Sequence, residues 1–223
     1  MELQNKIREF IYNRYNISFS KSGDDIQLMK LINQSTHGVY VDVGCWHPVK
    51  ASNTYYFYLR HWKGICIDPN PELKSLYDFY RKNDIFINSG IGNTSDALKY
   101  YMFDESSMNT FSNDFIDKNN LYSRIINTIE IPLKPLSLIL DENILENERL
   151  DFFDIDVEGF DIEVLKTNNW DKYRPKIIVV ESDVSIEEDL YSEITTYIQQ
   201  QDYRLIGKSV INGNLGNLFF IVK

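Results

Sequence analysis

The sequence predicts an α/β fold built on one doubly wound, mostly parallel sheet with helices on both faces. Three observations support this prediction. Short apolar runs rich in β-branched residues, such as "VYVDV" and "IIVV", alternate with segments of helical periodicity. The last two apolar runs are joined by the turn-rich "NGNLG", which is typical of an antiparallel strand pair. With 223 residues, 43% of them hydrophobic, the chain is long enough to form a single domain around one core.

Residues 1–37 precede the alternating pattern and predict two helices. Apolar residues recur at helical spacing from residue 3 to about residue 15, which indicates an amphipathic helix that packs on the chain that follows. The stretch "GDDIQLMKLINQ", residues 23–34, predicts a second helix. Acids occupy its first turn, and Gly38 lies just beyond its end.

From residue 39 onward, strands and helices are expected in turn. A helix over 52–62 is capped by Ser52 or Asn53, and a helix over 70–82 has Asn70 as its cap and Pro71 at its first position. Two more helices are predicted over 160–168 and 187–201. The expected strands are 39–43, 64–68, 84–91, 150–156 and 175–182, followed by the antiparallel pair 203–211 and 217–223.

Residues 93–135 interrupt this alternation. The segment is too long for a plain connection and is rich in aromatic residues, Ser, Asn and Asp. We expect an inserted cover over the substrate rather than a separate domain.

Charge and composition exclude several classes of partner. The net charge of −10 disfavours nucleic acid, because binding along a duplex depends on Lys and Arg. No apolar run is long enough for a membrane span, and the charged N-terminus does not resemble a signal peptide, so we expect a soluble cytoplasmic protein without a membrane partner. Cys45 and Cys66 are expected to be buried free thiols.

The ends of the first two strands carry candidate ligand-binding residues. Ligands of doubly wound sheets bind beyond the carboxyl ends of the strands. The first strand carries Asp42 and is followed by Gly44, which lets the backbone approach a ligand closely. The chain lacks the glycine-rich turn that holds a pyrophosphate, so a nucleoside without phosphates fits better. Asp68, at the end of the second strand, is placed to bind both hydroxyls of a ribose.

The stretch "DFFDIDVEGFDIEVL" carries acids on a strand of apolar rhythm. Asp156 is expected at the carboxyl end of the strand and Glu158 in the turn after it, while Glu181 ends the neighbouring strand, so the three are expected to converge. They provide either ligands for a divalent cation or metal-free acceptors and a base for a hydroxyl group, and we favour the metal-free interpretation. Asp154 lies further inside the sheet, where we expect it to pair with an Arg or Lys.

The segments "VYVDVGCWHPVKASNTYYFYLRHWKGICIDPNPE" and "LDFFDIDVEGFDIEVLK" resemble the FkbM-type S-adenosylmethionine-dependent methyltransferases. The resemblance covers roughly residues 18–182, and D-V-E-G is its most specific part. It implies a Rossmann-like class I methyltransferase fold, with a seven-stranded sheet that ends in an antiparallel pair. Members methylate hydroxyl groups, typically on sugars, glycans or polyketide-type natural products. This chain departs from the family at Asp154, where many members have a Lys or a small residue.

The resemblance also implies roles for individual residues. Asp68 holds the ribose of S-adenosylmethionine, and Asn88 and Ser89 lie near its adenine. The residues expected around the methionine end are Asp42, Gly44, His47, Ser52, Asn53 and Thr54. For His47 two roles are open: a base that takes the proton of the attacking hydroxyl, or a residue that fixes the loop by hydrogen bonds.

These observations favour an S-adenosylmethionine-dependent O-methyltransferase acting on a hydroxyl of a sugar, glycan or related small acceptor. Asp156, Glu158, Glu181 and His47 are the candidate catalytic residues. Two alternatives are a nicotinamide-dependent oxidoreductase, which shares the alternating pattern and the acid after the second strand, and a binding module of methyltransferase-like fold without turnover.

Overall fold

The computed structural model describes residue 11 and the ranges 17–33, 35–93, 97–145 and 148–223. The expected first helix, residues 3–15, lies outside this part of the chain except for Ile11. The second expected helix is present as α2 (Asp24–Leu31). No helix in the described ranges combines the length and the apolar character that crossing a bilayer requires.

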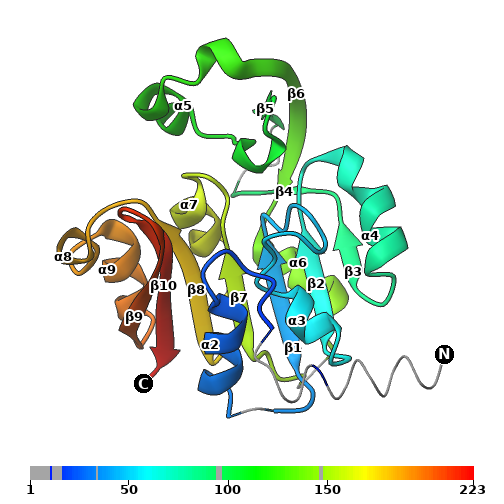
Figure 1. Cartoon of the computed structure of the whole chain (residues 1–223), viewed down its shortest axis with the longest axis vertical. Coiled ribbons are helices and arrows are strands. Elements are labelled where there is room, and N and C mark those ends of the chain that lie inside the picture. The colour runs from blue at the N-terminus through cyan, green and yellow to red at the C-terminus, as the bar shows by residue number, and fades with distance from the viewer. Residues whose placement is uncertain (1–10, 12–16, 34, 94–96, 146–147) are drawn as a thin grey trace.

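The main sheet has seven strands in the order β3-β2-β1-β7-β8-β10-β9, and it confirms the predicted fold class (Figure 1). The strand pairs from β3 to β8 are parallel, whereas β10 runs antiparallel to both β8 and β9. Their bounds are β1 (Val39–Val43), β2 (Lys63–Ile67), β3 (Ile85–Ile87), β7 (Phe152–Ile155), β8 (Ile177–Ser182), β9 (Tyr203–Asn212) and β10 (Leu215–Val222).

Helices cover both faces of the sheet. Residues along each strand point alternately to one face and the other, so the apolar strands present apolar side chains to both faces. Val39, Val41 and Val43 pack with α6 (Leu136–Asn143), α7 (Asp161–Lys166) and α9 (Glu193–Gln200). Tyr40 and Phe152 pack on the opposite face with α2, α3 (Tyr55–Tyr58) and α4 (Lys74–Tyr80). Each parallel strand is therefore buried on both sides, as its apolar run predicts.

Two expected helices are shorter or divided. The helix expected over 52–62 is the single turn α3. The segment expected as one helix over 187–201 forms α8 (Ile186–Asp189) and α9, because the Ser192 side chain accepts a hydrogen bond from the Thr195 N–H and starts a new helix. The expected cap at Asn70 is present, and it begins a short 3₁₀ turn (Pro71–Leu73) that leads into α4.

The strand expected over 84–91 is divided between two sheets. Its first part is β3, whereas β4 (Gly90–Ile91) joins β5 (Ala97–Phe103) and β6 (Ile125–Lys134) in a small sheet of order β4-β6-β5. This sheet and α5 (Asn113–Asn119) lie beyond the carboxyl ends of the parallel strands (Figure 1). Two further 3₁₀ turns, Ser106–Met108 and Tyr122–Arg124, complete this cap, by which we mean residues 90–134.

Gly44 brings the ends of two strands together. It has a φ of 81°, and its N–H bonds to the Ile67 carbonyl at 2.9 Å. A Cβ at this position would lie 1.7 Å from the carbonyl oxygen of Asp156. Because only glycine has no Cβ and adopts this φ without strain, Gly44 is what permits β1 and the segment after β7 to meet.

We predict that Gly44→Ala lowers the free energy of unfolding by about 3 kcal/mol or more, since left-handed strain and a backbone clash add. Gly213→Ala is the matched control, because Gly213 also has a positive φ of 58° but open space around its Cβ position. Strain alone should cost the control about 1–2 kcal/mol. Urea unfolding of both variants measures the difference, and equal losses would contradict the clash.

Candidate functional site

Carboxylates gather where β1 and β7 end. Asp42 of β1 lies beside Asp154 of β7 in the sheet register, and each is only 5% exposed. Successive residues of a strand point to opposite faces of the sheet. Asp42 and Asp154 therefore lie on the same face as Tyr40 and Phe152, which are two residues before them. Asp156, two residues beyond Asp154, lines the same pocket as these two acids. The sequence pattern of acids at every second position thus becomes a row on one side of the sheet.

An apolar pocket lies beyond the ends of β1 and β2 and is covered by the cap. Asp68 and Ser89 are among its polar lining residues. Its apolar walls are Val43, Ile67, Pro69, Ile91, Tyr100, Phe111, Val157, Phe160 and Val164.

Asp68 is held rigidly at the edge of this pocket. Its two carboxylate oxygens accept hydrogen bonds from the backbone N–H groups of Trp46 at 3.0 Å and Asn70 at 2.8 Å. A carboxylate has about four lone-pair positions, so each oxygen keeps capacity for a ligand hydroxyl. Burial raises the pKa of Asp68 to about 7, against the effect of the two N–H donors. The Asn88 side chain donates to the Asp68 carbonyl at 2.9 Å and fixes the same turn.

A polar pocket adjoins the apolar one. Its lining includes Asp42 and Asp154 from the sheet, Ser52 and Asn53 from the loop before α3, and Lys21 from the segment before α2. The two pockets are adjacent and share the lining residues Gly44, Trp46, Ser107, Asp156 and Glu158.

Hydrogen bonds from the loop before α3 hold the two sheet acids. The Thr54 hydroxyl donates to Asp42, and the Asn53 side-chain amide donates to Asp154 at 3.2 Å. Burial raises the pKa of Asp42 to about 6, and burial together with the neighbouring Asp42 raises the pKa of Asp154 well above its usual range. The expectation of an Arg or Lys partner for Asp154 was wrong: its side-chain partner in the structure is the neutral amide of Asn53.

Asp156, Glu158 and Glu181 converge as the sequence predicts. One carboxylate oxygen of each lies within 4.8 Å of the others. Asp156 and Glu158 follow β7, Glu158 in a left-handed conformation with a φ of 51°, and Glu181 lies on the adjacent β8. Burial and mutual repulsion raise the pKa of Glu158 to about 9 and that of Glu181 to about 11. Such a cluster takes up protons or a divalent cation, since three charges so close repel one another.

A wider groove of about 1740 Å³ runs from this cluster between the cap and the β8–α9 side of the sheet. Glu158 and Glu181 lie on it, so the cluster connects the groove with the two pockets. Phe115 of α5 lines one side, and Ile162 and Ile194 line the other.

The family model described as the methyltransferase FkbM domain matches residues 38–205. The chain belongs to this family. The match includes β1, β2, β7, β8 and the whole cap, so the acid cluster lies within an FkbM methyltransferase domain. A comparison with curated proteins gives no match to the sequence.

Three solved structures illustrate how far the fold resembles other methyltransferases. Precorrin-6y C5,15-methyltransferase from Geobacter metallireducens has a TM-score of 0.49 at 10% identity, covering 89% of this chain and 87% of the other. The 1,6-didemethyltoxoflavin-N1-methyltransferase of Burkholderia thailandensis has a TM-score of 0.46 at 11% identity, covering 91% and 78%. A TehB-like methyltransferase from Corynebacterium glutamicum has a TM-score of 0.44 at 9% identity, covering 100% and 97%. We draw no functional conclusion from these likenesses.

Most of the expected cofactor residues of this FkbM methyltransferase lie around the two adjacent pockets, either in the lining or directly behind it. Thr54 is fully buried behind the wall, and Asn88 supports Asp68 from outside the pocket. His47 is not brought into either pocket. Its Nδ1 accepts hydrogen bonds from the N–H groups of Val49 at 3.1 Å and Lys50 at 3.0 Å, so it fixes the loop. The expected cofactor residues that line the two pockets are Asp42, Gly44, Ser52, Asn53, Asp68 and Ser89.

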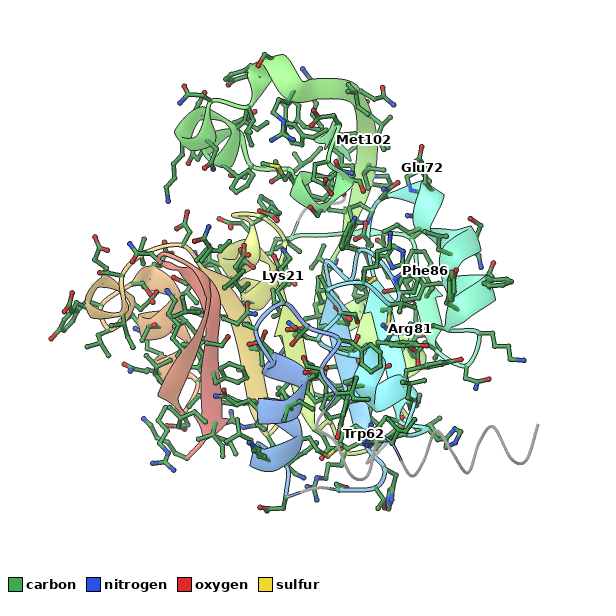
Figure 2. The ribbon with its side chains drawn as sticks, viewed as in Figure 1. Lys21, Trp62, Glu72, Arg81, Phe86 and Met102 are labelled. Atoms are coloured by element: carbon green, nitrogen blue, oxygen red, sulfur yellow. The ribbon has the colours of Figure 1, made fainter. Side chains whose placement is uncertain are left out.

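Sequence analysis misses several residues that shape the site. Trp46, in "GCWHP", lines both pockets, and its indole N–H donates to Ser106 of the cap at 2.9 Å. Lys21 lines the polar pocket and the groove, on the segment before α2 (Figure 2). No spacing links Lys21 to acids more than a hundred residues away. Arg81, at the end of a helix, has the pattern of a surface residue but is 1% exposed.

We predict that the free energy of unfolding falls as the pH rises from about 5 to about 9. The pKa of Glu158 is raised to about 9 and that of Glu181 to about 11, so the folded state binds more protons than the unfolded chain over this range. Glu181→Gln should make the dependence less steep, because it removes one of the repelling charges. Urea unfolding across this pH range measures the slope, with exposed Glu130→Gln as the control. An unchanged slope in Glu181→Gln would contradict the prediction.

Proposed function

We propose that this FkbM methyltransferase uses S-adenosylmethionine to methylate a hydroxyl group of a sugar, a glycan or a related natural product. The observation that carries the proposal is that an apolar pocket with Asp68 and a polar pocket with Asp42 lie side by side and share Gly44 and two acids of the Asp156 cluster in their lining.

The two pockets match the two halves of the cofactor. The apolar walls suit a purine, and the free lone pairs of Asp68 suit the two ribose hydroxyls. The methionine half carries an ammonium and, at the sulfur, a positive charge, and the acids of the polar pocket complement both. Gly44 lies where the two pockets adjoin, and the lack of a side chain there lets the segment with Asp156 approach β1 closely.

The cofactor supplies a methyl group on a positively charged sulfur. The chain's own contribution is to exclude water, to orient the acceptor hydroxyl and to take up its proton. Asp156 and Glu158 line both pockets, so they are the candidates for holding that hydroxyl. Because the pKa values of Glu158 and Glu181 are raised to about 9 and about 11, these two groups are protonated near neutral pH and can donate hydrogen bonds. Asp156 is therefore the candidate for taking up the proton.

The groove between the cap and the β8–α9 side is the proposed acceptor site. It opens from the acid cluster, which is where an acceptor hydroxyl must reach. We propose that the cap covers the acceptor and belongs, with the sheet, to one methyltransferase domain. Carboxylates that point into this groove suit the hydroxyl donors of a sugar.

Binding of S-adenosylhomocysteine, measured by calorimetry, tests the cofactor. We expect the wild type to bind and Asp68→Ala to bind at least about tenfold more weakly, because hydrogen bonds to a charged group contribute about 1.5–3 kcal/mol. Asp78→Ala, at an exposed position on α4, is the control. No binding by the wild type, or unaltered binding by Asp68→Ala, would count against the proposal. Tight binding of NAD would instead favour the oxidoreductase.

Transfer of labelled methyl groups to a panel of nucleotide sugars and glycans tests the reaction. We expect Asp156→Asn to lower turnover by about a hundredfold or more, as loss of a proton acceptor does. Its affinity for S-adenosylhomocysteine should persist, because that product has no charge on sulfur. Retained turnover would show that Asp156 is not used, and no transfer by the wild type would favour a binding module. Running each assay with and without a chelator reveals whether the cluster needs a cation.

A further inference from the structure

Arg81 forms a buried centre of hydrogen bonds beneath the polar pocket. It is 1% exposed and lies on the side of the sheet that α3 and α4 cover (Figure 2). Its Nε donates to Asp84 at 2.7 Å, and one terminal nitrogen donates to the Tyr40 hydroxyl at 2.6 Å. The Tyr40 hydroxyl in turn donates to Asp84 at 2.9 Å, so Arg81, Tyr40 and Asp84 form a closed ring of hydrogen bonds.

The other terminal nitrogen of Arg81 faces the loop before α3. It donates to the Thr54 hydroxyl oxygen at 3.0 Å, to the Ser52 hydroxyl oxygen at 3.4 Å and to the Pro48 carbonyl at 3.5 Å. Ser52 and the adjacent Asn53 line the polar pocket. One guanidinium group therefore fixes the back of the wall whose front faces the proposed methionine end of the cofactor.

The direction of the hydrogen bonds follows from the chemistry of the guanidinium. An arginine side chain donates and cannot accept, so the Thr54 oxygen must be the acceptor. The hydroxyl proton of Thr54 is then free to point to Asp42, to which Thr54 donates. A donor aimed at a carboxylate favours its ionised form. Arg81 thus acts on Asp42 by its charge and by the orientation it imposes on Thr54.

The other charges near Asp42 make this cation important. Asp84 compensates part of the charge of Arg81, and further acids surround Asp42. Lys21 also lines the polar pocket, but it is exposed to solvent. The remaining titratable groups that face Asp42 or its pocket, among the described residues, are Asp24, Tyr40, Cys45, Cys66, Asp68, Tyr77, Asp154, Asp156 and Glu158. Arg81 is the buried cation among the described groups that act on Asp42.

We propose that Arg81 is a positioning residue for the cofactor: through the Thr54 hydroxyl it keeps the Asp42 carboxylate oriented and ionised for the ammonium group of the methionine half. This inference rests on the proposed function, because the cationic group belongs to S-adenosylmethionine. Arg81 lines neither pocket, so it affects the ionisation of Asp42 in the polar pocket from behind the pocket wall.

The test compares two ligands over pH 5.5–8.5 by calorimetry. S-Adenosylhomocysteine reaches both pockets, whereas 5′-methylthioadenosine lacks the amino-acid half and reaches only the apolar one. The ratio of their affinities reports on Asp42, whose pKa is raised to about 6, while both ligands share the contribution of Asp68. In the wild type this ratio should be high at neutral pH and fall as the pH drops through about 6 and Asp42 becomes protonated.

Thr54→Val and Arg81→Met should move this fall to higher pH, so that at pH 7 the affinity ratio is roughly tenfold lower than in the wild type. Thr54→Ser, which keeps the hydroxyl, should restore the wild-type profile. The matched controls are Thr195→Val, another fully buried threonine, and Lys208→Met, which removes the cation of a buried ion pair in another part of the fold. Neither control should change the affinity ratio. Urea unfolding of each control and its matched variant shows how much stability each substitution costs.

The outcomes separate the two proposals. Failure of the wild type to bind either ligand overturns the proposed function. Binding of both ligands with an unshifted ratio in Thr54→Val leaves the proposed function standing but overturns the action of Arg81 through Thr54, even if Arg81→Met does not fold. An equal loss of affinity for both ligands in the variants would indicate general damage to the fold and would also overturn the role of Arg81.

Discussion

The site depends on one electrostatic constraint: carboxylates from neighbouring strands lie side by side where solvent is scarce. Asp42 and Asp154 are adjacent in the sheet register, and Asp156, Glu158 and Glu181 follow at the strand ends. Ionised carboxylates in such a place repel one another and lose hydration. The rest of the local structure supplies what compensates them: backbone N–H donors, side-chain donors, protons and cations.

Different acids are compensated in different ways, and this separates their roles. Asp68 receives two backbone N–H donors and is held in one orientation. Asp42 receives the Thr54 hydroxyl, which Arg81 orients from behind. Among the described residues no backbone N–H donates to the side chains of Asp156, Glu158 and Glu181, and burial raises the pKa of each. The groups proposed to bind the cofactor are thus held by hydrogen bonds, whereas the groups proposed to hold the acceptor lie where the pockets and the groove meet.

The cap shows how a segment of irregular sequence becomes part of a site. Residues 93–135 have no alternating pattern, yet β5 and β6 form an antiparallel pair and α5 packs on them through a small core of Phe103, Ile116 and Leu121. Trp46 joins this cap to the sheet, because its backbone N–H binds Asp68 and its indole N–H binds Ser106. The cap therefore closes the apolar pocket through the same residue that fixes Asp68.

The strands of the main sheet in chain order, the antiparallel pair at the end, and the acids at the strand ends were predictable from the sequence alone, whereas α6 and the strands of the cap were not. The predictable features follow from local signals: a buried parallel strand has a continuous apolar run, and a parallel sheet brings the carboxyl ends of its strands to one edge. For the same reason the meeting of Asp156, Glu158 and Glu181 was predictable from residues that lie in two separate strands.

Only the tertiary structure decided which groups compensate those acids. Asn53 rather than a cation binds Asp154, His47 holds its own loop instead of reaching a pocket, and Arg81 is buried although it ends a helix. Such partners come from distant parts of the chain, as Lys21 does for the acids after β7. Periodicity specifies which face of a strand or helix is buried, but the side chain that lies opposite depends on how the elements pack, and that is settled by the energy of the whole fold.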